Sequence, residues 1–114
     1  MIKRTILLLI IFIIHVPAFG AQTDISGNYE ASVMGSVIKA RIEQDGEAIQ
    51  GVAYVYAGGK RNTYHFEGTI NGNKIYAGHA NGHIFSGNVT PTGNLVGTLK
   101  TRSGHKIPVN AARQ

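Results

Sequence analysis

Residues 64–79 read YHFEGTINGNKIYAGH, two alternating segments joined by an Asn-Gly pair. Before the pair, Tyr64, Phe66, Gly68 and Ile70 occupy every second position, and polar residues lie between them. Such alternation is typical of a β-strand with one buried face, and Asn-Gly adopts the positive φ angles that a tight hairpin requires. The stretch therefore predicts a β-hairpin whose inward face continues beyond the turn.

Further turn signals divide the rest of the chain in the same way, and no window has the i, i+3, i+4, i+7 spacing of an amphipathic helix. The signals are Gly35-Ser36, Asp45-Gly46, a longer loop at 57–61, Asn71-Gly72, Asn81-Gly82, Pro91-Thr92-Gly93 and Ser103-Gly104. They predict eight strands, at 25–34, 37–44, 47–56, 62–70, 73–79, 83–90, 94–101 and 105–111.

A second set of glycines lies inside the predicted strands, in a repeat of apolar, any, Gly, any, apolar. The copies occur at 25–29, 49–53, 66–70, 85–89 and 95–99. Because a strand repeats every two residues, each glycine shares a face with the apolar residues beside it. Glycine on that face permits sharp bending and close approach of backbones, as a small closed barrel needs.

The turns also predict which face each strand turns inward. We expect two-residue turns at Gly35-Ser36, Asp45-Gly46 and Asn71-Gly72, and three-residue loops that end at Gly82, Gly93 and Gly104. This register gathers the apolar residues on one face and most charged residues on the other. The chain is therefore predicted to be all-β, an eight-stranded antiparallel up-and-down meander barrel, with a split sandwich as second choice. An apolar interior is the reverse of a membrane barrel, so no membrane span is expected in the mature chain.

The N-terminus has the features of a secretory signal peptide, because Lys3 and Arg4 precede an apolar run at 5–14 and small residues follow it. That run is too short to cross a bilayer as a helix. We expect residues 1–20 to be removed, leaving one small β-barrel domain at 21–114 that is periplasmic or secreted. With no cysteine in the chain, disulfides and a thiol nucleophile are excluded.

Composition argues against several function classes. After Lys3 and Arg4 are set aside, nine Lys and Arg face six Asp and Glu, a net charge of +3. These cations are scattered, so no nucleic-acid partner is expected. No phosphate-binding glycine loop is present, and two aspartates offer little to a Ser/His/Asp triad. We expect a protein that is not an enzyme.

The layout resembles the small secreted barrels of the calycin type, the lipocalins and avidins. The resemblance covers the meander, the strand count and the glycine spacing. Gly27-Asn28-Tyr29 lies where those families often carry Gly-x-Trp on the first strand, and this chain has no tryptophan. The resemblance implies a barrel with an open mouth that binds ligands, and it assigns no functional residue.

The predicted register brings three histidines to one end of the barrel. His79 and His83 form a cross-strand pair, Thr101 lies across from His83, His105 pairs with Thr101, and Tyr64 lies across from His79. Opposed residues have Cβ atoms about 4.5–5.5 Å apart, close enough for imidazoles to share an ion. His79, His83 and His105 would suit zinc or copper. The alternative is that they pack at the rim or contact a polar ligand.

Two function hypotheses follow. In the first, an exported binding barrel holds a small ligand or metal ion at the histidine mouth. Lys60 and Arg61 in the adjoining loop would suit an anionic ligand or an acidic partner surface. In the second, a protein-interaction or inhibitor-like module with a filled core uses its loops and the outward residues Tyr54, Tyr56 and Tyr76. The volume of the barrel interior discriminates between them.

Overall fold

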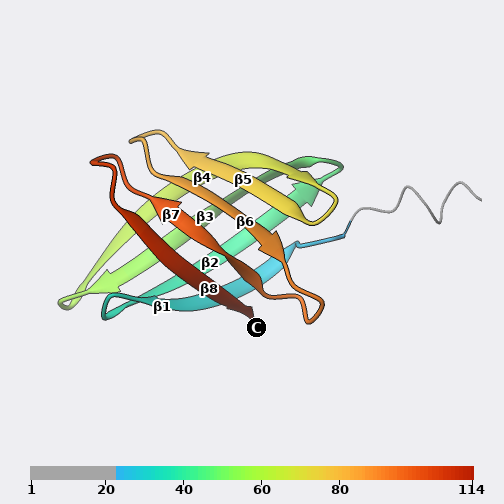
Figure 1. Cartoon of the computed structure of the whole chain (residues 1–114). Helices are drawn as coiled ribbons and strands as arrows, with labels where there is room; N and C mark the ends of the chain where they lie inside the picture. The colour runs from blue at the N-terminus through green and yellow to red at the C-terminus, as the bar shows by residue number, and fades with distance from the viewer. Residues whose placement is uncertain (1–22) are drawn as a thin grey trace, which may run out of the picture.

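The computed structural model describes residues 23–114, which form eight β-strands (Figure 1). Within this range there is no helix capable of crossing a membrane. The signal peptide predicted at residues 1–20 lies outside the described range. The strands are β1 (Gly27–Val33), β2 (Ser36–Asp45), β3 (Ala48–Ala57), β4 (Lys60–Asn71), β5 (Lys74–His79), β6 (Ile84–Val89), β7 (Leu95–Lys100) and β8 (Lys106–Arg113).

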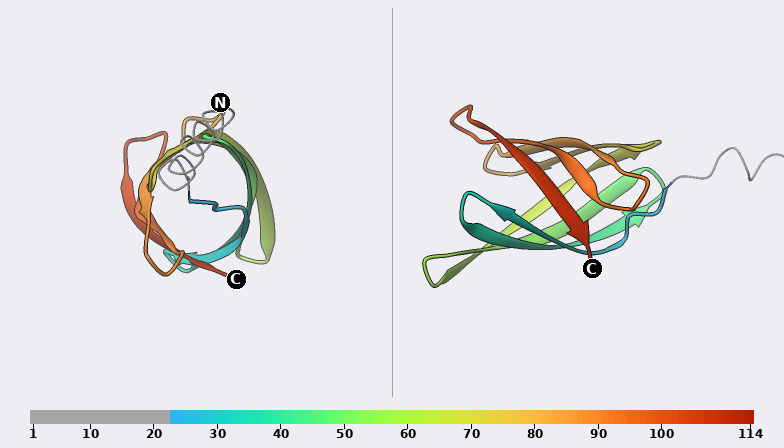
Figure 2. Two further views of the ribbon diagram at one scale, coloured as in Figure 1. Left: turned by 90° about the vertical axis from the view of Figure 1, so that its right-hand side faces the viewer. Right: turned by 60° about the horizontal axis from the view of Figure 1, so that its bottom comes forward.

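The strands close into a barrel in which each pairs antiparallel with the next along the chain. β8 returns to β1, where Tyr29 pairs with Arg113 and Glu30 with Ala112. The end-on view in Figure 2 shows this closure, with the C-terminus beside the first strand. The predicted eight-stranded antiparallel meander barrel is confirmed.

The three hairpins predicted to have three-residue loops form as expected. At the first, the His79 N–H donates to the His83 carbonyl and the Gly82 N–H donates to the His79 carbonyl, both at 2.9 Å. Gly82, Gly93 and Gly104 all have positive φ angles, between 90° and 95°. These glycines act as the bulge residues that keep the next strand's apolar face inward.

The predicted two-residue turns are each displaced by one residue. The first turn is Met34-Gly35, since Val33 pairs with Ser36. The other two are Gly46-Glu47 and Gly72-Asn73, because Asp45 pairs with Ala48 and Asn71 with Lys74. Each displacement moves the pairing by two positions and leaves every side chain on its predicted face, since the strand period is two.

The prediction of a long loop at 57–61 is also wrong. β3 and β4 remain paired up to Ala57 and Lys60. Only Gly58 and Gly59 form the turn, with φ angles of 58° and 79°. Two consecutive positive φ angles belong to a type I′ turn, which suits the twist of a hairpin. Lys60 and Arg61 are therefore strand residues.

One end of the barrel is filled by a cluster of buried aliphatic side chains with Tyr29. Its members include Ile25, Tyr29, Ile42, Ile49, Ile70, Ile75, Val89 and Leu95. The first strand was predicted to begin at Ile25, but β1 begins at Gly27. The segment that contains Ile25 instead turns across this end of the barrel (Figure 2). Ile25 is fully buried, and its N–H donates to Gln44 Oε1 at 2.8 Å.

Arg113 and Tyr29, which pair across β1 and β8, both hold this segment through hydrogen bonds. The Tyr29 hydroxyl donates to the Ile25 carbonyl at 2.8 Å. The Arg113 guanidinium donates to the main-chain carbonyls of Ser26 and Asp24 and to Tyr29 Oη. The N-terminal segment and the last strand therefore close this end of the barrel together.

Candidate ligand-binding cavity

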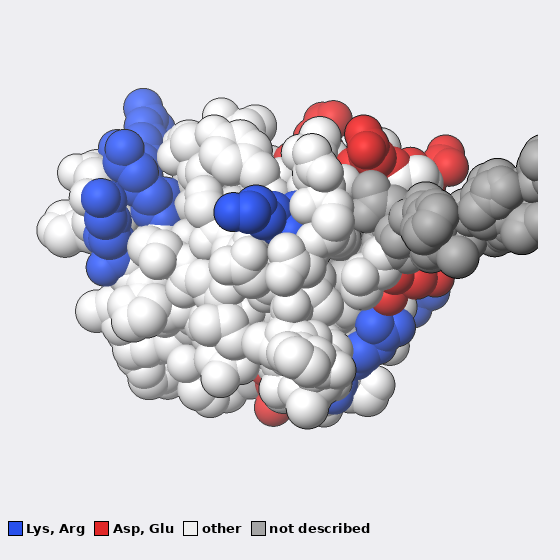
Figure 3. All heavy atoms as spheres, turned by 45° about the vertical axis from the view of Figure 1, so that its right-hand side comes forward, with Lys and Arg blue, Asp and Glu red and all other residues white. Residues whose placement is uncertain are grey.

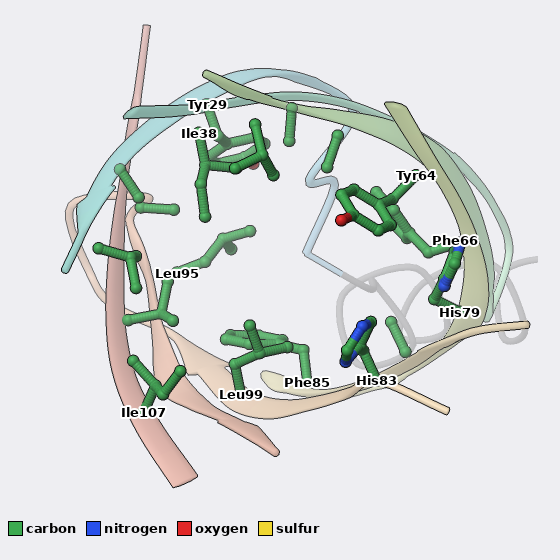
Figure 4. Close-up of a pocket in the computed structure, with 18 of the residues that line it drawn as sticks. Tyr29, Ile38, Tyr64, Phe66, His79, His83, Phe85, Leu95, Leu99 and Ile107 are labelled. Carbon is green, nitrogen blue, oxygen red and sulfur yellow. The ribbon is translucent and has the colours of Figure 1, made fainter. Parts of the chain in front are cut away.

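The other half of the barrel contains a cavity of about 420 Å³. All eight strands contribute to it, and it reaches the end where the turns at 34–35, 80–82 and 102–104 lie. Its apolar lining includes Ala31, Val33, Ile38, Ala40, Ala53, Val55, Phe66, Phe85, Leu99, Ile107 and Val109 (Figure 4).

Small inward side chains account for the space. Four alanines occupy inward positions where larger side chains would reach the barrel axis. They are Ala31 on β1, Ala40 on β2, Ala53 on β3 and Ala77 on β5. An eight-stranded barrel is just wide enough for side chains to fill it, so alanine at these positions leaves it hollow. The volume lies within the range of about 300–1,000 Å³ found for small-molecule pockets, which combine apolar linings with a few polar groups.

The polar groups of the lining are concentrated around Tyr64, His79 and His83, here called the mouth triad. The Tyr64 ring meets the His79 ring edge-on, with centroids 4.9 Å apart, and the His83 ring at 6.0 Å. The two imidazoles stack at 5.9 Å with an interplanar angle of 19°. Figure 4 shows the three rings on one side of the cavity, with the Tyr64 hydroxyl directed into it.

Both imidazoles use Nδ1 to hold the loops of the mouth. His79 Nδ1 accepts the N–H of Asn81 at 3.1 Å, and His83 Nδ1 accepts the N–H of Arg102 at 3.3 Å. An accepting Nδ1 places the proton of a neutral ring on Nε2, which is then a donor. His83 also links the 80–82 loop to the neighbouring 102–104 loop.

The remaining polar atoms of the mouth triad have no partner in the protein. Within residues 23–114, no hydrogen bond joins Tyr64 Oη, His79 Nε2 or His83 Nε2 to another group. All three side chains are half-buried and line the cavity. Their free hydroxyl and Nε2 groups can therefore donate hydrogen bonds to a molecule inside the barrel.

Tyr64 reaches the mouth triad from a different register than predicted. Phe66, not Tyr64, is directly opposite His79 on β4. The β4–β5 turn is displaced by one residue, so Tyr64 lies diagonally across the ladder. Diagonal neighbours remain within reach of aromatic side chains, and the Tyr64–His79 contact is preserved.

The expected metal site is not present in the described part of the chain. His105 pairs with Thr101 as predicted, but its side chain is exposed and its Nδ1 lies 2.9 Å from Ser103 Oγ. Among residues 23–114, no three His, Cys, Asp or Glu side chains are placed to hold one ion. The prediction of zinc or copper bound by His79, His83 and His105 is wrong because a shared face did not bring His105 to the other two rings.

The remaining predicted ligand contacts divide between the cavity and the surface. Thr101 lines the cavity, and its hydroxyl accepts the His105 N–H at 3.1 Å. Lys60 and Arg61 are exposed and do not line it. Arg61 instead lies over the outward Tyr54 ring, 5.0 Å from its centroid. Tyr54 and its neighbours thus face outward as predicted.

Two residues of the mouth were not predicted as site residues. Met34 lines the cavity although 83% of its surface is exposed, and it has a φ angle of 51°. Arg102 approaches His83 through its main chain, while its aliphatic stem packs against Gly82. The register that opposes Thr101 to His83 could have placed Arg102 here, but no sequence signal marked Met34.

No protein-family model matches this chain, and comparisons with curated proteins and with solved structures also found no match. The eight-stranded up-and-down barrel is consistent with a calycin-like layout, and its geometry alone carries that likeness.

Proposed function

We propose that this protein is an exported binding barrel that holds a small, mainly apolar ligand in the cavity beside the mouth triad. The observation that carries the proposal is the combination of an apolar cavity of about 420 Å³ with unpartnered donors on Tyr64, His79 and His83. Apolar walls supply affinity, and a few fixed polar groups orient the ligand. Export rests on the signal peptide predicted at residues 1–20.

Binding without chemical transformation is the role that this site supports best. The lining contains two imidazoles but no carboxylate that could orient a ring or act as a base. Both Nδ1 atoms are already engaged by main-chain N–H groups. The histidines are therefore suited to hold the loops and to donate to a ligand.

The alternative, an interaction module with a filled core, has less support. Tyr56 and Tyr76 are 39% and 55% exposed on the outer face. However, Tyr56 and Tyr54 already lie beneath cations of the same chain, Lys39 at 5.8 Å and Arg61 at 5.0 Å. The interior volume, which separates the two hypotheses, favours the binding barrel.

A fluorescence titration with N-phenyl-1-naphthylamine, a neutral apolar dye, tests this function. We expect saturable enhancement that is lost in Ala53→Leu, because Ala53 lines the cavity and pairs with Tyr64 across β3 and β4. Val52→Leu enlarges the adjacent side chain on the outer face and is the matched control. Binding that is absent from the wild type, or equally strong in both variants, would contradict a ligand inside the barrel.

A further inference from the structure

The open end of the barrel carries cations and no acidic residue in its turns, although Lys74 and Arg113 place cations at the closed end as well. Lys60, Arg61 and Arg102 lie in or directly beside the turns at the open end, and Lys100 and Lys106 pair with each other close to them. No Asp or Glu lies in those turns or lines the cavity. Figure 3 shows a group of cationic side chains at one end of the barrel and most acidic ones toward the other, where further cations lie beside them.

The acidic residues are concentrated at the closed end or on the outer face. Asp45 and Glu47 flank Gly46 at the closed-end turn, and Asp24 belongs to the segment that covers that end. Glu67 is exposed on the outer face, where it pairs with Gly78, two residues before the 80–82 loop. A low-dielectric cavity whose entrance carries one sign of charge concentrates ions of the opposite sign.

The mouth triad also favours an anionic group, through hydrogen bonds at short range. Tyr64 Oη and the Nε2 atoms of the neutral His79 and His83 rings can all donate hydrogen bonds. Hydrogen bonds from such donors to an ionised acceptor are shorter and about twice as strong as those to a neutral one. A group of donors below a cationic rim therefore selects an anionic head.

Below the mouth triad the lining is almost entirely hydrocarbon, with Phe66, Phe85, Leu99 and Ile107 around the space. No charged residue lines it. We propose that the ligand is a single-chain amphiphile with an anionic head group. Its head lies between the mouth triad and Arg102, and its alkyl chain lies along the barrel axis. This inference rests on the proposed function and specifies the chemical class of its ligand.

Isothermal titration calorimetry of the protein with three probes of equal chain length tests the inference. We expect dodecanoate to bind at least about tenfold more tightly than 1-dodecanol, because the carboxylate accepts charge-assisted hydrogen bonds. Dodecylammonium should bind most weakly. The preference should decrease between low and high ionic strength, since exposed cations such as Arg102 are screened by salt.

Two variants test whether residues of the mouth cause the preference for dodecanoate over dodecanol. Arg102→Gln and Tyr64→Phe should each weaken dodecanoate binding about threefold to tenfold and change dodecanol binding little. Lys74→Gln is the matched control, because Lys74 is an exposed cation beside the closed-end turn. A dodecanoate affinity that is insensitive to Arg102→Gln and Tyr64→Phe would overturn the proposed position of the head.

The outcomes separate this inference from the function on which it rests. Equal affinity for dodecanoate and dodecanol would overturn the anionic head and leave the apolar binding site supported. Dye binding and probe binding that are both absent would overturn both. Sedimentation with phosphatidylglycerol vesicles, without heat from dodecanoate, would assign the anion to a bilayer surface and overturn the single-chain ligand.

Discussion

Gly87 and Gly97 face each other across β6 and β7, so close that a Cβ atom on Gly97 would lie 2.5 Å from the Gly87 Cα. The same Cβ would collide with the main-chain oxygen of Ser86. Both glycines belong to the inward repeat, and neither has a positive φ angle. They are needed for the close approach of backbones where the barrel curves.

Gly97→Ala should therefore destabilise the barrel by roughly 1–3 kcal/mol or more, because backbone atoms must move to admit the methyl group. Gly68→Ala should behave similarly, since its Cβ would meet the backbone of Tyr76 and Ala77. Gly78→Ala is the control, because its Cβ would meet only the His83 oxygen at 3.9 Å. Urea unfolding measures all three, and equal midpoints for Gly97→Ala and Gly78→Ala would refute the argument.

The barrel could be predicted from the sequence because its information is local. Asn81-Gly82 and Pro91-Thr92-Gly93 specify loops of three residues, and the repeat places Gly87 and Gly97 on the inner face. Errors at the two-residue turns left the faces intact, since each moved the pairing by two positions. Barrel closure then followed from the need to cover the apolar face and both edges.

The site could be predicted only in part. Strand periodicity shows which side chains share the inner face, but it does not determine the position of their functional groups. His79 and His83 meet as predicted, since a tight loop joins them directly. His105 lies on the same face, two strands further along a curved sheet, and its ring turns to Ser103 instead. The hydrogen bonds that close the other end, from the Ile25 N–H to Gln44 and from Arg113 to Asp24 and Ser26, join residues far apart in sequence, and strand periodicity does not predict such bonds.

The Arg113 side chain is expected to stabilise the closed end of the barrel. Arg113→Gln should lower the free energy of unfolding by about 1–2 kcal/mol, because hydrogen bonds that involve a charged group contribute more than neutral ones. Arg113→Lys should recover only part of the loss, since an ammonium cannot reproduce the bonds of the planar guanidinium. Lys74→Gln, at the same end, should change stability by less than about 0.5 kcal/mol. The free energies of unfolding are measured by chemical denaturation. An equal decrease for Arg113→Gln and Lys74→Gln would disprove the role of Arg113.

The Tyr29 hydroxyl should make stability fall in alkaline solution. Burial raises the pKa of Tyr29 above its ordinary value of 10.0, an effect that the nearby Arg113 charge partly offsets. The folded state thus holds the proton more tightly than the unfolded chain, so this contribution is complete below pH 10. It is lost as the pH rises from there through the folded pKa.

Tyr29→Phe allows this contribution to be measured. The variant should be less stable than wild type by about 1–3 kcal/mol at neutral pH, because the buried Ile25 carbonyl loses its donor. The difference should be constant between pH 7 and 9 and should narrow above pH 10. Tyr76→Phe, which alters an exposed ring, is the control. A difference that does not change up to the alkaline limit of folding would rule out the titration of Tyr29.

Met34 occupies a turn position that suits its side chain poorly, and we expect its replacement to reveal a trade-off. Met34 and Gly35 have φ angles of 51° and 83°, the two positive values of a type I′ turn, for which Asn-Gly is strongly preferred. Met34→Asn should therefore raise the free energy of unfolding by about 0.5–1 kcal/mol. The same change removes an apolar side chain from the cavity mouth and should weaken binding of the alkyl probes. Met34→Leu, which keeps both the strained turn and the apolar side chain, should leave stability and binding near wild type. Urea unfolding and calorimetry of the two variants test this account. It would be contradicted if Met34→Asn lowered the free energy of unfolding, or if Met34→Asn bound dodecanoate as tightly as Met34→Leu.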